Sequence, residues 1–128
     1  ATLRRDGSPR ISGTEAEVVA GELLWGSMLR AVKALDLLRD GRFALHSGSE
    51  DPPGWTGDAK VSGVAEELDD PERKRALTEQ QGAEGDLGEF HLFRADVREV
   101  VVTRLNDARD KLVIEWWREG EGVRRTER

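Results

Sequence analysis

The sequence predicts a mostly β, antiparallel fold with two or so short helices. Three observations predict it: about seven short segments alternate as strands do, turn-forming residues separate them, and two segments have helical spacing. A parallel sheet would need strands alternating regularly with helices, which the sequence lacks. At 128 residues we expect one domain over positions 1–128, with a charged, poorly fixed tail at 118–128.

The first strands are joined by tight turns. Asp6-Gly7 separates two short extended stretches, the strongest local signal for a β-hairpin. Ala20-Gly21 predicts a second turn, between Val18-Val19 and an apolar strand over 22–28. The chain opens on Ala1-Thr2-Leu3, a strand-like sequence without an initiator Met, so we expect further residues upstream.

Helical spacing over 30–40 predicts a short amphipathic helix that ends at Gly41. Asp70-Pro71 predicts a second helix, with Asp70 as N-cap and Pro71 at the first helical position. The remaining predicted elements are strands at 42–47, 60–68, 89–95, 99–105 and 111–117, and loops at 48–58 and 81–88.

Composition excludes several classes of function. A net charge of −6 and a pI near 5.0 oppose non-specific nucleic-acid binding, which requires a basic surface. No apolar run approaches the roughly 20 residues of a membrane helix, and cysteine is absent. We therefore expect a soluble protein of the reducing cytoplasm, without a membrane or nucleic-acid partner.

The order of the elements resembles the pyridoxamine 5'-phosphate oxidase-like family. The resemblance rests on an ordered series over most of the chain: a hairpin with Asp6-Gly7-Ser8-Pro9-Arg10, a strand ending Trp25-Gly26-Ser27, a helix over 33–40, strands at 42–47 and 58–65, and the Asp70-Pro71 helix. It implies an antiparallel Greek-key split β-barrel. It also implies a homodimer that binds flavin mononucleotide (FMN), or in some branches coenzyme F-420, in a groove between subunits.

The resemblance also implies which residues hold the cofactor. The ring and ribityl chain are expected along Arg10, Ile11, Ser12 and Gly13, and the phosphate near Gly26, Ser27 and a helical Lys that matches Lys33. Val32 stands where the family often has an Arg, so part of the phosphate clamp is absent unless Arg30 supplies it. A C-terminal Trp, here Trp117, is expected at the pocket from the partner subunit.

Physical chemistry supports a phosphate at this place and also offers simpler roles. A phosphate is bound by a cation, hydroxyl groups and backbone N–H groups, which Lys33, Ser27 and a helix N-terminus would supply. In the simpler reading Lys33 is a solvated charge, Arg30 forms a surface salt bridge, and Ser27 is an N-cap.

For the remaining histidine and tryptophan residues, the sequence favours structural roles over metal binding or catalysis. His46 and His91 are far apart in the sequence, so we expect no metal site. Trp25 is expected in the core, and adjacent Trp116 and Trp117 must point to opposite faces of a strand, leaving one for a dimer interface. No catalytic acid, base or nucleophile stands out.

The sequence thus predicts an FMN-dependent oxidoreductase acting on an unidentified small molecule, with the flavin carrying out hydride transfer. Two alternatives remain open: an F-420-dependent reductase of the same fold, and a flavin-binding or cofactor-free protein without catalytic activity.

Overall fold

The computed structural model describes residues 1–85 and 88–128, so part of the predicted 81–88 loop lies outside the described residues. Its elements in chain order are β1 (Thr2–Leu3), β2 (Pro9–Arg10), β3 (Ala16–Val19), β4 (Glu22–Met28), α1 (Val32–Arg39), β5 (Arg42–His46), β6 (Asp58–Leu68), α2 (Pro71–Gln80), β7 (Phe90–Leu105), β8 (Leu112–Arg118) and β9 (Gly122–Glu127).

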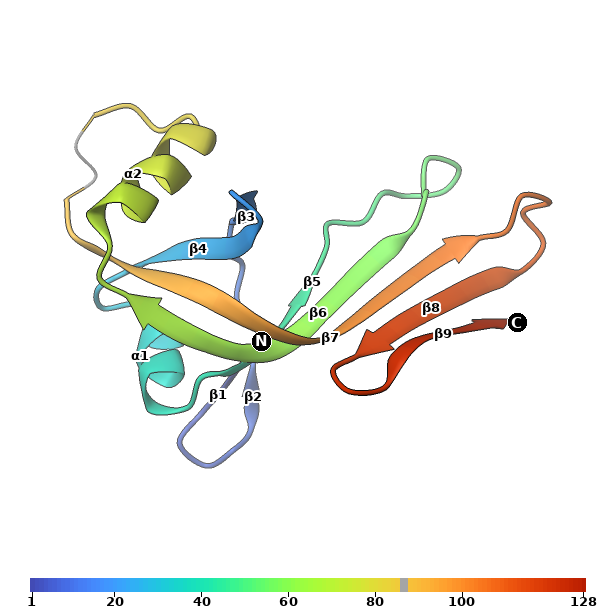
Figure 1. Cartoon of the computed structure of the whole chain (residues 1–128), viewed down its shortest axis with the longest axis horizontal. Coiled ribbons are helices and arrows are strands. Elements are labelled where there is room, and N and C mark those ends of the chain that lie inside the picture. Colours follow the sequence, from blue (N-terminus) through green and yellow to red (C-terminus); the bar gives the residue numbers. More distant parts are fainter. Residues whose placement is uncertain (86–87) are drawn as a thin grey trace. The chain divides into compact units, whose positions relative to one another are not determined.

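The strands form two sheets (Figure 1). β1 and β2 pair antiparallel around the predicted Asp6-Gly7 turn. The larger sheet has the order β3-β4-β7-β6-β5, with β8 paired to β7 and β9 paired to β8. Its β3-β4, β4-β7, β7-β8 and β8-β9 pairs are antiparallel. The predicted mostly β, antiparallel class is confirmed.

The chain divides into two compact units. The first comprises Ala1–Phe43 and Val64–Asp96, and the second comprises Ala44–Gly63 and Val97–Arg128. β6 and β7 each contribute residues to both units. The expectation of a single domain stays a prediction.

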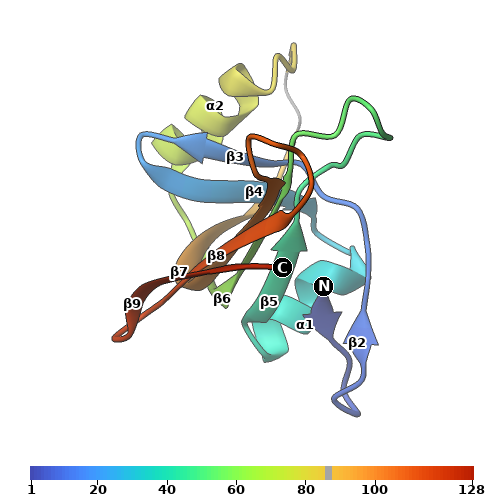
Figure 2. The same ribbon diagram turned by 90° about the vertical axis from the view of Figure 1, so that its right-hand side faces the viewer.

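In the first unit, β4 is buried on both faces. Leu24 packs with Leu77 of α2 and Leu92 of β7 on one face, and Figures 1 and 2 both show α2 lying along β3 and β4. Trp25, on the other face, contacts Phe93 with ring centroids 6.0 Å apart. Burial on both faces explains why this strand is a continuous apolar run rather than an alternating one, and it confirms Trp25 as a core residue.

Helix α1 begins later than predicted. Residues Met28 to Ala31 form a turn, in which the Ala31 N–H donates to the Met28 carbonyl at 3.0 Å, and the helix starts at Val32. Ala31 occupies the N-cap position with extended backbone and no side-chain cap. Because Ser27 lies within β4, the prediction that it caps this helix is wrong.

Helix α2 begins as the sequence predicts. The Asp70 carboxylate accepts hydrogen bonds from the backbone N–H groups of Glu72 and Arg73, both at 3.1 Å, and Pro71 occupies the first helical position. This cap satisfies two of the N–H groups that a helix start leaves without partners.

The C-terminal third differs from the prediction in two ways. Residues 90–105 form one strand rather than two: its first part pairs with β4 and its second part with β8. The predicted loose tail instead forms β9, an edge strand on β8. Positive φ angles at Gly120 and Gly122 make the turn that reverses the chain there. Neither helix among the described residues is long and apolar enough to cross a bilayer.

Candidate functional site

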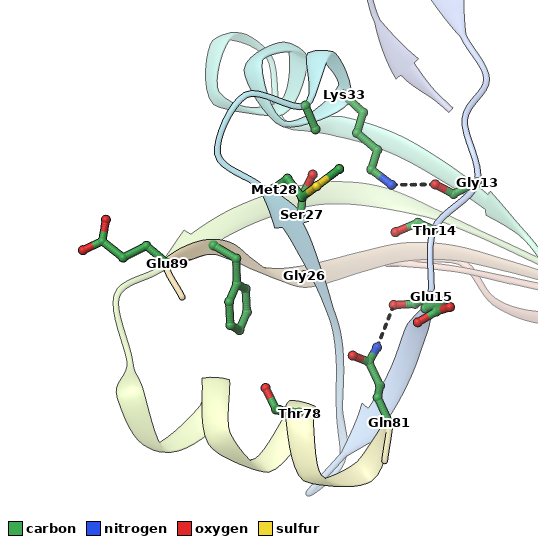
Figure 3. A pocket seen from close by; sticks show the side chains of 12 residues that line it. Gly13, Thr14, Glu15, Gly26, Ser27, Met28, Lys33, Thr78, Gln81 and Glu89 are labelled. Carbon is green, nitrogen blue, oxygen red and sulfur yellow. Dashed lines mark hydrogen bonds between the residues drawn. The ribbon is translucent and has the colours of Figure 1, made fainter. Parts of the chain in front are cut away.

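A cavity of about 680 Å³ lies in the first unit, between α1, α2, β4 and the segment that leads into β3 (Figure 3). This volume is within the usual range of sites for small molecules and cofactors. Its lining residues are Gly13, Thr14, Glu15, Gly26, Ser27, Met28, Ala31, Lys33, Thr78, Gln81, Glu89 and Phe90.

Lys33 is the cation of the cavity wall. It stands in the first turn of α1, and its Nζ donates to the Gly13 carbonyl oxygen at 2.5 Å (Figure 3). An ammonium group has three N–H donors, so this hydrogen bond leaves it able to donate to a ligand as well. The bond also ties the extended segment before β3 to the start of α1.

Two hydroxyl groups of the lining have no hydrogen-bond partner within the part of the chain that the structure describes. Ser27 is only 6 % exposed, and its Oγ has no hydrogen-bond partner among the described residues. The Oγ1 of Thr14 is likewise buried and unpartnered within the described part of the chain. A buried polar group left unsatisfied costs about 1–3 kcal/mol. Polar atoms in this state, beside a cation, suit a ligand that accepts hydrogen bonds.

The start of α1 adds to the positive character of this end of the cavity. Ala31, the N-cap residue, is part of the lining and offers no side-chain acceptor to the first turn. The first N–H groups of a helix point along its axis and carry its partial positive charge. Lys33, Ser27 and the uncapped helix start therefore form one cluster of hydrogen-bond donors with positive character, which we call the α1 end.

The other walls have a different character. Figure 3 shows Thr78 of α2 and Gln81, the C-cap residue of that helix, at the end opposite Lys33, with Glu15 and Glu89 on opposite sides. The Gln81 amide donates to the Glu15 carbonyl at 3.3 Å. These polar groups suit hydroxyl or amide groups of a ligand, but not a second anion.

Gly26 forms the floor between the two ends. A Cβ at this position would lie 3.2 Å from the ring of Phe90, which also lines the cavity. The absence of a side chain therefore lets Phe90 pack against the strand and leaves the cavity open above it.

A buried ion-pair cluster lies next to this cavity on α1. Asp36 is 2 % exposed, and its carboxylate accepts hydrogen bonds from Arg10 at 2.7 Å, Arg39 at 3.0 Å and Thr2 at 2.9 Å. Burial opposes ionisation of Asp36, yet the hydrogen bonds from Arg10 and Arg39 outweigh it and lower its pKa to about 2. The cluster anchors the β1-β2 hairpin on the helix that carries Lys33.

The cavity brings together four of the nine residues predicted for the cofactor. Gly13, Gly26, Ser27 and Lys33 line it, whereas the other five are elsewhere: Arg10, Ile11, Ser12, Arg30 and Trp117. Arg10 is engaged by Asp36, and Ile11 is 89 % exposed. Arg30 is an exposed residue of the turn before α1, and Trp117 belongs to the second unit.

Sequence reasoning missed most of the wall that α2 contributes. Thr78 and Gln81 are far from Lys33 in the sequence, and they reach the cavity because Leu77 packs against Leu24 of β4 and Leu92 of β7. Phe90 is brought there by the β4-β7 pairing, in which it is the partner of Met28. A signal for Thr14 lay in the β3-β4 hairpin, because extending the Ala16–Trp25 pairing by two residues places Thr14 opposite Ser27. No group of three or more His, Asp or Glu within the described residues could hold a metal ion.

Comparison with known proteins gives information on the fold. No protein-family model matches the chain, and neither does any curated protein. Among solved structures, PhzG from Burkholderia lata 383, in complex with tetrahydrophenazine-1-carboxylic acid, is similar with a TM-score of 0.64 and 14% identity, over 99% of this chain and 78% of PhzG. The heme binding protein from Mycobacterium smegmatis is similar with a TM-score of 0.61 and 19% identity, over 98% of this chain.

The class of protein that follows is a mostly β protein with the split-barrel fold of these two structures, which confirms the fold predicted from the sequence. At these identities the likeness shows the fold alone. The chain spans only 50% of the heme binding protein.

Proposed function

We propose that the protein is an FMN-binding oxidoreductase, with the FMN phosphate at the α1 end of the cavity. The observation that carries the proposal is the combination of Lys33 with the buried, unpartnered hydroxyl of Ser27. A phosphate monoester accepts hydrogen bonds from a cation, a hydroxyl and helix N–H groups together. The α1 end has each of these donors.

The residues present fit the cofactor along the rest of its length. The ribityl chain carries hydroxyl donors, for which Glu15 and Gln81 supply acceptors. Phe90 and Gly26 supply a flat apolar wall for a ring. When bound, the flavin would supply hydride transfer, while Lys33, Ser27 and Thr14 would fix its phosphate.

The ligands named for the two similar structures are consistent with this proposal. PhzG was solved with tetrahydrophenazine-1-carboxylic acid, and the mycobacterial protein binds heme. Each ligand combines an extended ring system with acidic groups, as FMN does. A homodimer, with the cavity completed by the partner subunit, is part of the proposal.

FMN is favoured over coenzyme F-420 by the arrangement of the arginines. The longer acidic tail of F-420 would require a broad basic groove, and the Arg-rich segment 30–42 made that an open alternative. Arg39 is instead paired with Asp36, and Arg42 with Asp40 at 2.7 Å. Among the described residues that line the cavity, Lys33 is the one cation, which matches a single phosphate group.

The absorbance spectrum of the purified protein tests the proposal directly. A band at about 450 nm identifies oxidised flavin, and one at about 420 nm identifies the deazaflavin. If neither is present, titration with FMN is the deciding measurement, and failure to bind it at millimolar concentration would refute the proposal.

Substitution of Lys33 tests the assigned phosphate site. We expect Lys33→Ala to weaken FMN binding about tenfold or more, because a charge-assisted hydrogen bond to the phosphate is lost. Lys60→Ala is the matched control, since Lys60 is an exposed lysine of β6 in the second unit. Equal affinity of the Lys33 variant and the wild type would remove Lys33 from the site.

A further inference from the structure

His91 occupies a position behind the α1 end that its sequence context does not reveal. It is the antiparallel partner of Ser27 in the β4-β7 pair, and its side chain is only 15 % exposed. Its ring lies 5.9 Å from that of Phe93. His91 is thus packed against the sheet directly beside the unpartnered hydroxyl, although it does not line the cavity.

Both ring nitrogens of His91 face hydrogen-bond acceptors. Nδ1 lies 2.5 Å from a carboxylate oxygen of Glu67 on β6, and Nε2 lies 3.3 Å from the carbonyl oxygen of Leu29. A neutral imidazole has one N–H donor, whereas the imidazolium has two. Only the protonated ring can donate to both groups at once.

The Leu29 carbonyl belongs to the turn that presents the α1 end to a ligand. This turn runs from Met28 to Ala31 and is closed by the Ala31 N–H bond to the Met28 carbonyl. It joins the strand that carries Ser27 to the helix that carries Lys33. A hydrogen bond from His91 therefore restrains the spacing between the hydroxyl and the ammonium group.

We propose that His91, as an imidazolium, is a positioning residue of the anion site, holding the Met28–Ala31 turn through the Leu29 carbonyl so that anion affinity falls when the ring loses its proton. The inference rests on the proposed function, because FMN is the anion assigned to this site. Glu67 is the charged side chain in hydrogen-bond contact with the ring. Further charged residues on the adjoining segments include Glu66 on β6, Arg94 on β7, Glu89 just before β7, and Arg30 and Lys33 after β4.

FMN affinity measured against pH tests the proposal. Histidine side chains in general change charge between about pH 5 and pH 8, so the affinities are compared at pH 5.5 and at pH 8. We expect His91→Gln to bind FMN about tenfold more weakly than the wild type at the acidic end and about equally at the basic end. The phosphate also titrates in this range, but it does so in both proteins, so the ratio of the two affinities removes its contribution.

Two further variants sharpen the experiment. In Glu67→Gln the side-chain amide can donate to Nδ1, so a neutral ring keeps its N–H for the Leu29 carbonyl. The loss of affinity between acidic and basic pH should therefore be smaller than in the wild type. His46→Gln is the matched control, because His46 is the other histidine of the chain and contacts the Ser47 carbonyl in the second unit. It should follow the wild type at every pH.

Amide exchange in the cofactor-free protein separates this inference from the proposed function. The Ala31 amide closes the turn, so its protection should be higher in the wild type than in His91→Gln at acidic pH, with the difference vanishing at basic pH. If FMN binds but the affinity ratio is the same at every pH, the role of His91 is refuted and the flavin proposal stands. If FMN does not bind, Ala31 protection that is equal in both proteins at every pH refutes the role independently.

Discussion

Ser27 is almost completely buried, and its hydroxyl is satisfied by no group among the described residues. Such a group weakens the ligand-free protein, because its hydrogen bonds to water are lost on folding and not replaced. The same group becomes favourable when a ligand supplies the acceptor. At the scale of single residues, the proposed ligand would therefore offset a local loss of stability at this hydroxyl.

Substitution of Ser27 should have opposite effects on stability and on binding. We expect Ser27→Ala to leave the free energy of unfolding of the cofactor-free protein unchanged or raise it by about 1 kcal/mol, because the unpartnered hydroxyl is removed. FMN affinity should fall several-fold. Urea unfolding and FMN titration measure the two effects, and a large loss of stability would indicate that the hydroxyl has a partner within the protein.

Asp36 should make stability depend on acid pH. Its pKa in the folded protein, about 2, is lower than the ordinary 3.8, so its contribution is fully present above the ordinary value and is lost as the pH falls toward 2. Asp36→Asn removes the buried charge opposite Arg10 and Arg39 and should cost about 3 kcal/mol at neutral pH.

Urea unfolding at several pH values measures this contribution. The difference between the wild type and Asp36→Asn should be constant above about pH 5 and should shrink below about pH 4. Asp51→Asn, an exposed position in the loop after β5, serves as the control. If the difference in free energy of unfolding did not change with pH even near pH 2, the ion pairs of Asp36 could not be its source.

Local signals predicted the elements that depend on local chemistry. Asp70-Pro71 begins α2 where predicted because capping involves only neighbouring groups of the chain. The strand β9 was missed because its residues are mostly charged and exposed, which an edge strand tolerates. β9 is held in place by its antiparallel pairing with β8, and the residue types of this segment do not predict that pairing.

The capping of α2 is open to a direct measurement. Asp70→Ala should lower the free energy of unfolding by about 1 kcal/mol, because two backbone N–H groups lose their acceptor and Arg73 loses an ion pair at 2.6 Å. Asp69→Ala is the matched control, since Asp69 is the adjacent exposed carboxylate. If the two variants were equally stable, the cap would contribute nothing.

At the scale of the whole molecule, the site depends on long-range packing and on association. Lys33 and Ser27 could be named from the sequence because they match positions of the family that it resembles. The wall from α2 follows from helix packing that no local pattern encodes. The expected dimer has a candidate surface beside the cavity: Met28 is 78 % exposed, Val32 52 % and Leu35 50 %. Trp116 and Trp117, which suggested an interface from the sequence, are both half-buried.

Sedimentation equilibrium tests the dimer. We expect the wild type to sediment as a dimer at micromolar concentration. Leu35→Asp should shift the equilibrium toward the monomer, because it would bury a charge in the apolar dimer interface. Val18→Asp, on the exposed edge strand β3, should behave as the wild type. A wild-type monomer would argue strongly against a site completed by a second subunit.

The contact between Gly26 and Phe90 offers a way to obstruct the cavity without changing any charge. One added methyl group would stand 3.2 Å from the aromatic ring, closer than such atoms usually pack, so the ring would have to yield by a few tenths of an ångström. Gly26→Ala should therefore reduce the cavity volume available to a ligand while leaving every charged and hydroxyl group of the lining in place. A single substitution at this position would be enough to narrow or reopen the cavity.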